Sequence, residues 1–151
     1  MNIWFLRLVR FECTIIAIYH VLLGVVATLM PELAAKLAPV MYGISLEILA
    51  PLKPEYLVII RFMGAFAITF GLLMAFAAWD PLSNGTIVLG GAIFFSLRIL
   101  DRVLGADILI SSFQTTPLQN LAHILLMSSF VVILGGFSIY RSRQSAKVAA
   151  A

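Results

Sequence analysis

Four long apolar runs constrain the fold of this chain more than any other feature of its sequence. A helix that crosses the hydrocarbon core of a bilayer, about 30 Å thick, needs roughly 20 mostly apolar residues. Runs that meet this requirement cover residues 13–30, 56–79, 86–104 and 118–140. They are continuous rather than alternating, and in lipid only a helix satisfies its own backbone hydrogen bonds within one segment. The sequence therefore predicts an all-α bundle of four transmembrane helices.

The composition excludes soluble alternatives. Hydrophobic residues make up 62% of the chain and charged residues only 11%, whereas a soluble domain is roughly 45–50% apolar and about 25% charged. These values exclude a soluble enzyme domain, a disordered chain and a nucleic-acid-binding module. We expect residues 1–140 to form a single membrane domain, followed by a basic, disordered tail at residues 141–151.

The connections between the runs carry local signals of their own. Residues 80–85 read Asp-Pro-Leu-Ser-Asn-Gly, a composition typical of a tight turn, so the second and third spans should form an antiparallel hairpin. Residues 31–38 predict a short helix on the membrane surface. Pro31 suits the first position of a helix, and Glu32 and Lys36 form a favourable pair four residues apart.

Basic residues beside the spans predict the orientation of the protein in the membrane. Five of them lie on the side that both termini share: Arg7, Arg10, Arg141, Arg143 and Lys147. The opposite loops hold Lys36 and Lys53, each near an acidic residue. We therefore expect both termini to be cytoplasmic.

Ionisable side chains within the apolar runs are the candidate functional residues, because each costs about 2.5–3.5 kcal/mol at the centre of a membrane helix. With a rise of about 1.5 Å per residue, Arg61, Arg98, Asp101 and His123 should share one layer beneath the non-cytoplasmic face. Arg102 joins them, because residues 98, 101 and 102 lie on one face of the third helix.

Three interpretations of this layer remain open. It could be an ion-pair network that fixes the register of the helices, or Arg98 and Arg102 could extend to the lipid headgroups. In the functional interpretation it is a shallow pocket, where three arginines against Asp101 and Asp107 leave surplus positive charge for an anionic headgroup or polar small molecule. Three further residues could line the mouth of that pocket: Gln114, Gln119 and Asn120.

Small residues mark the positions where membrane helices can approach closely. The candidates for helix packing are Gly24, Gly64, Gly71, Gly90 and Gly135. We expect them to pack helices within the bundle.

Signatures of cofactors and catalysis are missing from the sequence. His20 and His123 differ in expected depth by roughly 12 Å in a bilayer about 30 Å thick, which disfavours a haem held between them. Metal-site, nucleophile-elbow, dinucleotide and phosphate-loop motifs are absent, as is a carboxylate–histidine cluster for a di-iron site. The sequence thus favours a non-catalytic protein without a metal or a predicted cofactor, and a bound lipid or quinone remains open.

The chain resembles the DoxX-like group of small four-helix bacterial membrane proteins. The resemblance depends on the proline-bounded first loop ending near Tyr42 and Gly43, the Arg-Phe-Met-Gly segment at residues 61–64, Gly71, and Arg98 late in the third span. A short basic tail also fits. The sequence departs from the group at residues 105–107, which read Gly-Ala-Asp where Asp-Gly is usual. The resemblance implies a bacterial inner-membrane location, and it implies little about activity, although a few members associate with membrane oxidoreductases.

The leading functional hypothesis is an accessory or scaffolding subunit of a larger membrane complex, with lipids and other membrane subunits as partners. The alternative is a lipid- or quinone-binding protein that uses the polar layer. A further alternative is a subunit of a membrane oxidoreductase. No nucleic-acid partner is expected.

Overall fold

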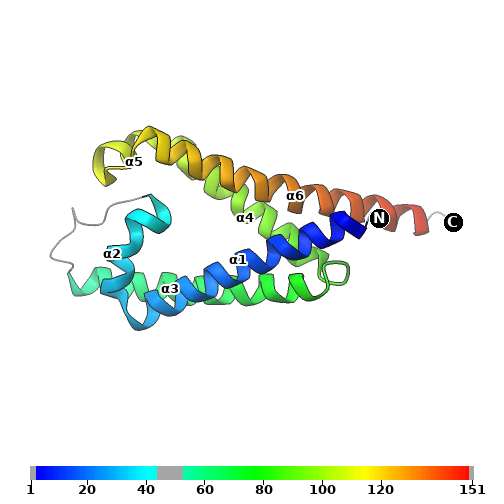
Figure 1. The fold of residues 1–151 in the computed structure, drawn as a ribbon, viewed down its shortest axis with the longest axis horizontal. Helices are drawn as coiled ribbons and strands as arrows, with labels where there is room; N and C mark the ends of the chain where they lie inside the picture. The colour runs from blue at the N-terminus through cyan, green and yellow to red at the C-terminus, as the bar shows by residue number, and fades with distance from the viewer. Residues whose placement is uncertain (1–2, 44–52, 150–151) are drawn as a thin grey trace.

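The protein is all-α, with helices joined by short turns and no strand, in the residues that the computed structural model describes, which are 3–43 and 53–149. Figure 1 shows the helices in chain order: α1 (Ile3–Leu29), α2 (Pro31–Tyr42), α3 (Pro54–Trp79), α4 (Gly85–Leu104), α5 (Ala106–Phe113) and α6 (Pro117–Ala149). The all-α prediction is confirmed for this part of the chain.

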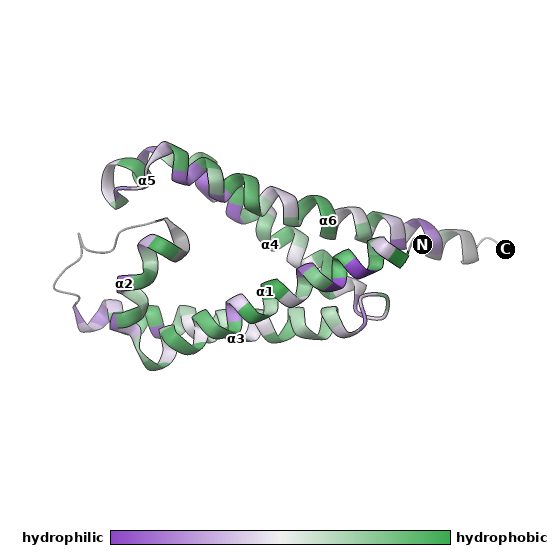
Figure 2. Ribbon diagram, in the orientation of Figure 1, coloured by the Kyte–Doolittle hydropathy of each residue, from purple (hydrophilic) through white to green (hydrophobic). Residues whose placement is uncertain are grey.

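Three of these helices, α1, α3 and α6, are long and apolar enough to cross a membrane, and Figure 2 shows hydrophobic residues over much of their length. They indicate a membrane protein. Four such spans were expected. The remaining one, residues 86–104, forms α4, a helix of 20 residues that does not meet this criterion of length and apolar composition. Its uncharged part ends at Leu97, and Arg98, Asp101 and Arg102 crowd its last two turns.

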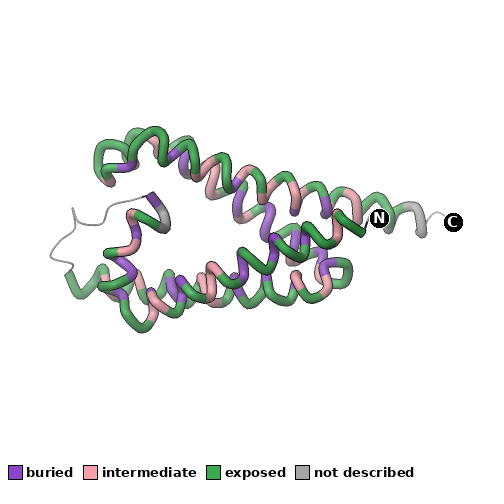
Figure 3. Tube along the Cα trace, in the orientation of Figure 1, coloured by how far each residue is buried: buried purple, intermediate pink, exposed green. Residues whose placement is uncertain are grey.

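The helices associate as two pairs. α1 packs most extensively against α3, and α4 packs against α6, whereas contacts between the pairs are fewer. The pairs converge where both termini and the α3–α4 turn lie, and they diverge toward α2 and α5 (Figure 1). The buried residues of the core join all four long helices; among them are Val9, Cys13, Ile16, Met74, Val88, Phe95, Leu134 and Phe137. Figure 3 shows that exposed residues predominate at the diverging end.

Glycines set the distance between α1 and α3. A Cβ added to Gly24 would lie 2.6 Å from the backbone oxygen of Gly64, and one added to Gly71 would lie 2.9 Å from the backbone oxygen of Ala17. These two contacts lie seven residues apart on each helix, as expected for an antiparallel pair at a shallow crossing angle.

Gly90 and Gly135 do not share this role. A Cβ at either position would meet nothing within 4 Å, so the expectation that they pack helices within the bundle was wrong. Gly90 lies on a face of α4, and Gly135 on a face of α6, where no other described helix comes into close contact.

The turn between α3 and α4 forms where the sequence predicts it. The Asp80 carboxylate accepts hydrogen bonds from the Leu82 and Ser83 backbone N–H groups at 3.1 and 3.3 Å and from the Ser83 hydroxyl at 2.6 Å. The bond from the Ser83 hydroxyl is the main reason that the pKa of Asp80 lies below its ordinary value. Asn84 donates from its amide to the Phe76 carbonyl at 3.0 Å, which also satisfies the end of α3.

Both ends of the chain are more helical than predicted. α1 begins at Ile3, ten residues before the expected start at Cys13. α6 continues through the basic segment to Ala149, so the expected disorder of residues 141–149 was wrong. The segment contains no proline or glycine, and its Arg, Gln, Ala and Lys residues are good helix formers.

Two of the loops contain more helix than the sequence predicts. α2 begins at Pro31 as expected but extends beyond residue 38 to Tyr42, where Gly43 ends it with a positive φ of 63°. The third loop contains a helix that was not predicted, α5. Expectations for residues 44–52 fall outside the described residues.

Candidate functional site

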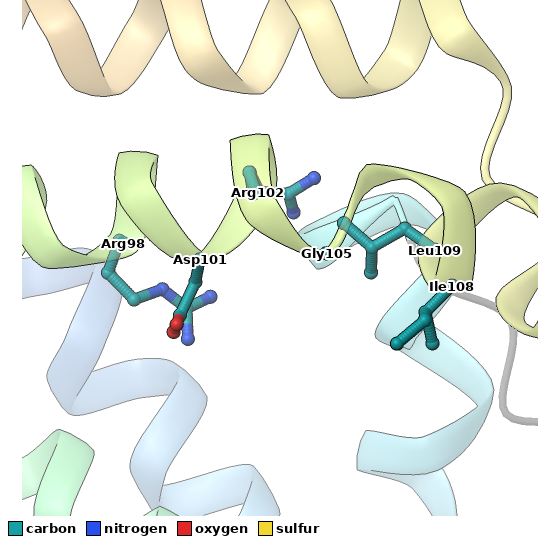
Figure 4. Close-up of a pocket in the computed structure, with 6 residues that line it drawn as sticks. All are labelled: Arg98, Asp101, Arg102, Gly105, Ile108 and Leu109. Atoms are coloured by element: carbon teal, nitrogen blue, oxygen red, sulfur yellow. The ribbon is translucent and has the colours of Figure 1, made fainter.

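The charged end of α4 lines a pocket of about 240 Å³ at the diverging end of the protein. Its lining residues come from α4, α5 and their junction: Arg98, Asp101, Arg102, Gly105, Ile108 and Leu109. In Figure 4, Arg98 and Asp101 project together from one side of α4, whereas Arg102 extends toward the α4–α5 junction. The pocket thus combines three charged side chains with two apolar ones.

Arg102 is the most deeply buried of these charges, with 6% of its surface exposed. Its Nη1 donates to Oδ1 of Asn120 at 3.0 Å, and the Asn120 amide donates back to the Arg102 backbone carbonyl at 3.3 Å. Asn120 is equally buried. The pair therefore joins α4 to α6, and Asn120, expected at the mouth of a pocket, instead positions an arginine.

α1 contributes to the same layer through two neighbouring residues that were not predicted as part of the site. The charges of Arg98 and Arg102 act on the Tyr19 hydroxyl, and the charge of Arg98 also acts on the His20 ring. A polar pair within an apolar run was the available signal, but from the sequence His20 was considered only as a disfavoured haem ligand or, preferably, as a hydrogen-bonded core histidine.

Arg98 and Asp101 stand apart from Arg102 in their bonding. Within residues 3–43 and 53–149, the side chain of neither forms a hydrogen bond or a salt bridge. Arg98 is half-buried and Asp101 is exposed. The interpretation of the layer as an ion-pair network is therefore not supported by these two residues, although they share a face of α4.

Arg61 and His123 do not line the pocket. Arg61 is exposed on α3, and the α1–α3 pair diverges from α4 toward this end of the protein (Figure 1). His123 Nδ1 lies 2.8 Å from the Gln119 carbonyl of its own helix. The predicted convergence of Arg61, Arg98, Asp101 and His123 is thus corrected: Arg98 and Asp101 come together, with Arg102 beside them.

His123 instead lies at a contact between α2 and the start of α6. A Cβ added to Gly43 would lie 3.0 Å from the His123 ring, and the buried Thr115 hydroxyl donates to the Gly43 carbonyl. We call these three residues the α2 latch, because they connect the end of α2 to the α5–α6 junction.

The other polar residues expected near the site have structural partners or lie on the surface. Gln119 and Thr116 form a capping box at the start of α6, in which the Thr116 N–H donates to Gln119 Oε1 at 2.9 Å and the Gln119 N–H donates to Thr116 Oγ1 at 3.2 Å. Gln114 ends α5 with a positive φ of 53° and is exposed, as is Asp107.

His20 lies in an aromatic cluster between the helices. Its Nδ1 is 2.8 Å from the Ile16 carbonyl, and its ring packs edge-on against Phe70 with 4.8 Å between centroids. Phe94 and Phe95 lie at 6.1 and 6.2 Å. In the described part of the chain, no three His, Cys, Asp or Glu side chains gather as potential metal ligands.

Glu12 is a second residue that sequence reasoning missed. It is 6% exposed within α1, and its Oε2 has no hydrogen-bond partner among the described residues. The predicted span began one residue later, at Cys13, so this carboxyl was placed outside the membrane. If the first helix had been predicted to begin before Cys13, it would have included Glu12.

Comparison with protein-family models, curated proteins and solved structures finds no match for this chain.

Proposed function

We propose that the protein is an integral membrane protein that binds the phosphate-bearing headgroup of a lipid in the pocket at the end of α4. The observation that carries this proposal is the Arg98 guanidinium, which lines the pocket and forms no ion pair or hydrogen bond with a described side chain. Arginine binds phosphate through strong charge-assisted hydrogen bonds. Arg102, held by Asn120, adds positive charge to the same wall.

The size and the lining of the pocket favour a headgroup attached to hydrocarbon. Its volume of about 240 Å³ falls below the range of roughly 300–1,000 Å³ typical of sites that enclose a whole small molecule. Ile108 and Leu109 extend the wall with apolar surface, and Leu97, Leu100 and Leu104 are exposed on α4 beside it. Acyl chains would lie along these side chains while the headgroup enters the pocket.

A quinone fits this site less well. Its ring carries no formal charge and would leave Arg98 uncompensated, at a cost that increases where water is scarce. A phosphate compensates that charge.

We extend the proposal to the membrane arrangement. In it, α4 is the fourth membrane helix, with its charged end turned toward the pocket rather than the lipid, as membrane-embedded charges usually are. The basic residues beside α1 and α6 support cytoplasmic termini in this proposal, and the DoxX-like resemblance supports a bacterial inner membrane as the location.

The test compares two arginines that differ in position but not in chemistry. Arg98→Gln should reduce retained phospholipid by about tenfold or more in native mass spectrometry, since a hydrogen bond to a charged group contributes about 1.5–3 kcal/mol. Arg61→Gln is the matched control, because Arg61 is exposed and does not line the pocket. Equal retention by Arg98→Gln and the parent protein would refute the proposal.

A second candidate is an accessory subunit of a membrane complex, and Gly90 and Gly135 favour it. Membrane helices associate closely at small residues, and a Cβ added to either glycine would meet no other atom of the described chain within 4 Å. Gly90→Leu should not lower the thermal stability of the isolated protein, because leucine is a better helix former than glycine, but it should reduce co-purification of a defined partner in mild detergent. Unchanged co-purification would remove this support.

A further inference from the structure

We infer that the lipid bound at this pocket is zwitterionic, with its phosphate at Arg98 and a primary ammonium at Asp101, as in a phosphoethanolamine headgroup. This inference deepens the proposed function and depends on it. It gives the Asp101 carboxylate a role as the partner of the ammonium. A site that bound only anions would leave the presence of this carboxylate unexplained.

The three charged side chains of the pocket differ in whether they have a partner. Arg102 has a partner in Asn120. Arg98 and Asp101 line the same pocket, project from the same side of α4 (Figure 4), and have no side-chain partner among the described residues. The pocket therefore presents one uncompensated cation and one uncompensated anion to its occupant.

A purely anionic headgroup satisfies only half of this arrangement. Its phosphate would compensate Arg98 but would lie near the Asp101 carboxylate, and like charges at short distance repel strongly away from bulk water. A headgroup with a phosphate and an ammonium compensates both residues. Arg98 and Asp101 are three residues apart, or about 4.5 Å along the helix axis, so the two ligand charges must lie close together, as a two-carbon link requires.

The lining also distinguishes between ammonium types. A primary ammonium donates hydrogen bonds to a carboxylate, whereas the quaternary ammonium of choline has no N–H and is usually recognised by aromatic faces. None of the residues that line the pocket is aromatic. The structure thus favours ethanolamine over choline.

The experiment offers the purified protein an equimolar mixture of phosphatidylethanolamine, phosphatidylcholine and phosphatidylglycerol with identical acyl chains. Native mass spectrometry then measures which lipid is retained. The parent protein should retain phosphatidylethanolamine at least about fivefold over each of the others, a difference of roughly 1 kcal/mol. Equal retention of the three lipids, or a preference for phosphatidylglycerol, would overturn the inference and leave the proposed function standing.

Variants separate the two charges. Asp101→Asn should retain phospholipid but lose the preference for phosphatidylethanolamine over phosphatidylglycerol, and Asp101→Glu should keep it. Asp107→Asn is the matched control, because Asp107 is exposed on α5 and does not line the pocket. If Asp101→Asn keeps the preference of the parent protein for phosphatidylethanolamine, the carboxylate does not bind the ammonium and the inference fails. If Arg98→Gln keeps all three lipids, the proposed function itself fails.

A final arm identifies the source of the headgroup. Glycerophosphoethanolamine carries the same phosphodiester and ammonium charges without acyl chains. Retention of the lipid in its presence supports a membrane ligand, and displacement of the lipid at equal concentration would overturn the assignment to a lipid.

Discussion

Gly64→Ala should weaken the packing of α1 against α3 and thereby destabilise the protein. The added Cβ would lie 2.8 Å from both the Gly24 backbone oxygen and the Thr28 backbone nitrogen, and 2.5 Å from the Thr28 hydroxyl. The hydroxyl belongs to a side chain that can rotate. The two backbone atoms belong to α1 and cannot move without moving the helix.

The magnitude follows from these distances. Ordinary contact begins at 3.4 Å, so α1 and α3 must separate locally by about 0.6 Å to admit the methyl group. Overpacking of this kind costs about 1–3 kcal/mol, and the better helix propensity of alanine returns up to about 1 kcal/mol. Gly64→Ala should therefore lower the free energy of unfolding by up to about 2 kcal/mol after the full propensity gain is subtracted.

Gly90→Ala provides the matched control. Its Cβ would meet nothing within 4 Å, so only the propensity gain of up to about 1 kcal/mol remains. Unfolding in mixed micelles with increasing sodium dodecyl sulfate, followed by the fluorescence of Trp4 and Trp79, should give a lower midpoint for Gly64→Ala than for the control. Identical midpoints for the two variants would show that backbone contact between α1 and α3 does not limit stability.

Three further predictions concern polar contacts. Asn120→Leu should lower the free energy of unfolding by about 1.5–3 kcal/mol, because it removes a side-chain acceptor from the buried Arg102 guanidinium. Ser96→Ala is the control. It removes a hydrogen bond within one helix and should change the free energy of unfolding by less than about 0.5 kcal/mol. Thr115→Val should speed hydrogen exchange at the end of α2, since the α2 latch loses its buried donor; unchanged exchange there would contradict the assigned contact. The lowered pKa of Asp80 means that its turn bonds stabilise the protein at neutral pH and are lost as pH falls through the folded-state pKa, below about pH 4. Asp80→Ala should therefore flatten the acid limb of a thermal stability profile, and an unchanged limb would exclude this carboxylate as its origin.

The sequence was sufficient to predict α2 and the four long helices, although not α5, because the signals of those five helices are local. A continuous apolar run has few options in lipid, and the turn residues at Asp80 and Asn84 act through hydrogen bonds to their own neighbours. Pro31 begins α2 for an equally local reason. Helix ends were less predictable, because α1 and α6 continue as helices beyond their apolar stretches.

The site was only partly predictable, because depth along a helix does not determine which helices lie side by side. Arg61 and Arg98 can share a layer and still be separated, since α3 pairs with α1 and α4 pairs with α6. That pairing depends on close backbone contacts such as the one between Gly24 and Gly64. Small residues in the sequence indicate that such contacts exist, but they do not show which two helices form them. The Arg102–Asn120 bond joins residues 18 positions apart and has no local signal at all.

The diverging pairs explain why the pocket lies beyond the core, toward the diverging end of the protein. Apolar side chains such as Phe95, Leu134 and Phe137 bring the four long helices together where both termini lie. Charged residues at the end of α4 could not be buried in such a core unless each had a partner, and only Arg102 has a described one, in Asn120. The divergence leaves Arg98 and Asp101 accessible to a ligand without weakening the core. Substitutions of these two residues should therefore change which lipid is retained while the unfolding midpoint stays near that of the parent protein, whereas a large loss of stability would mean that they hold the fold together rather than form a site.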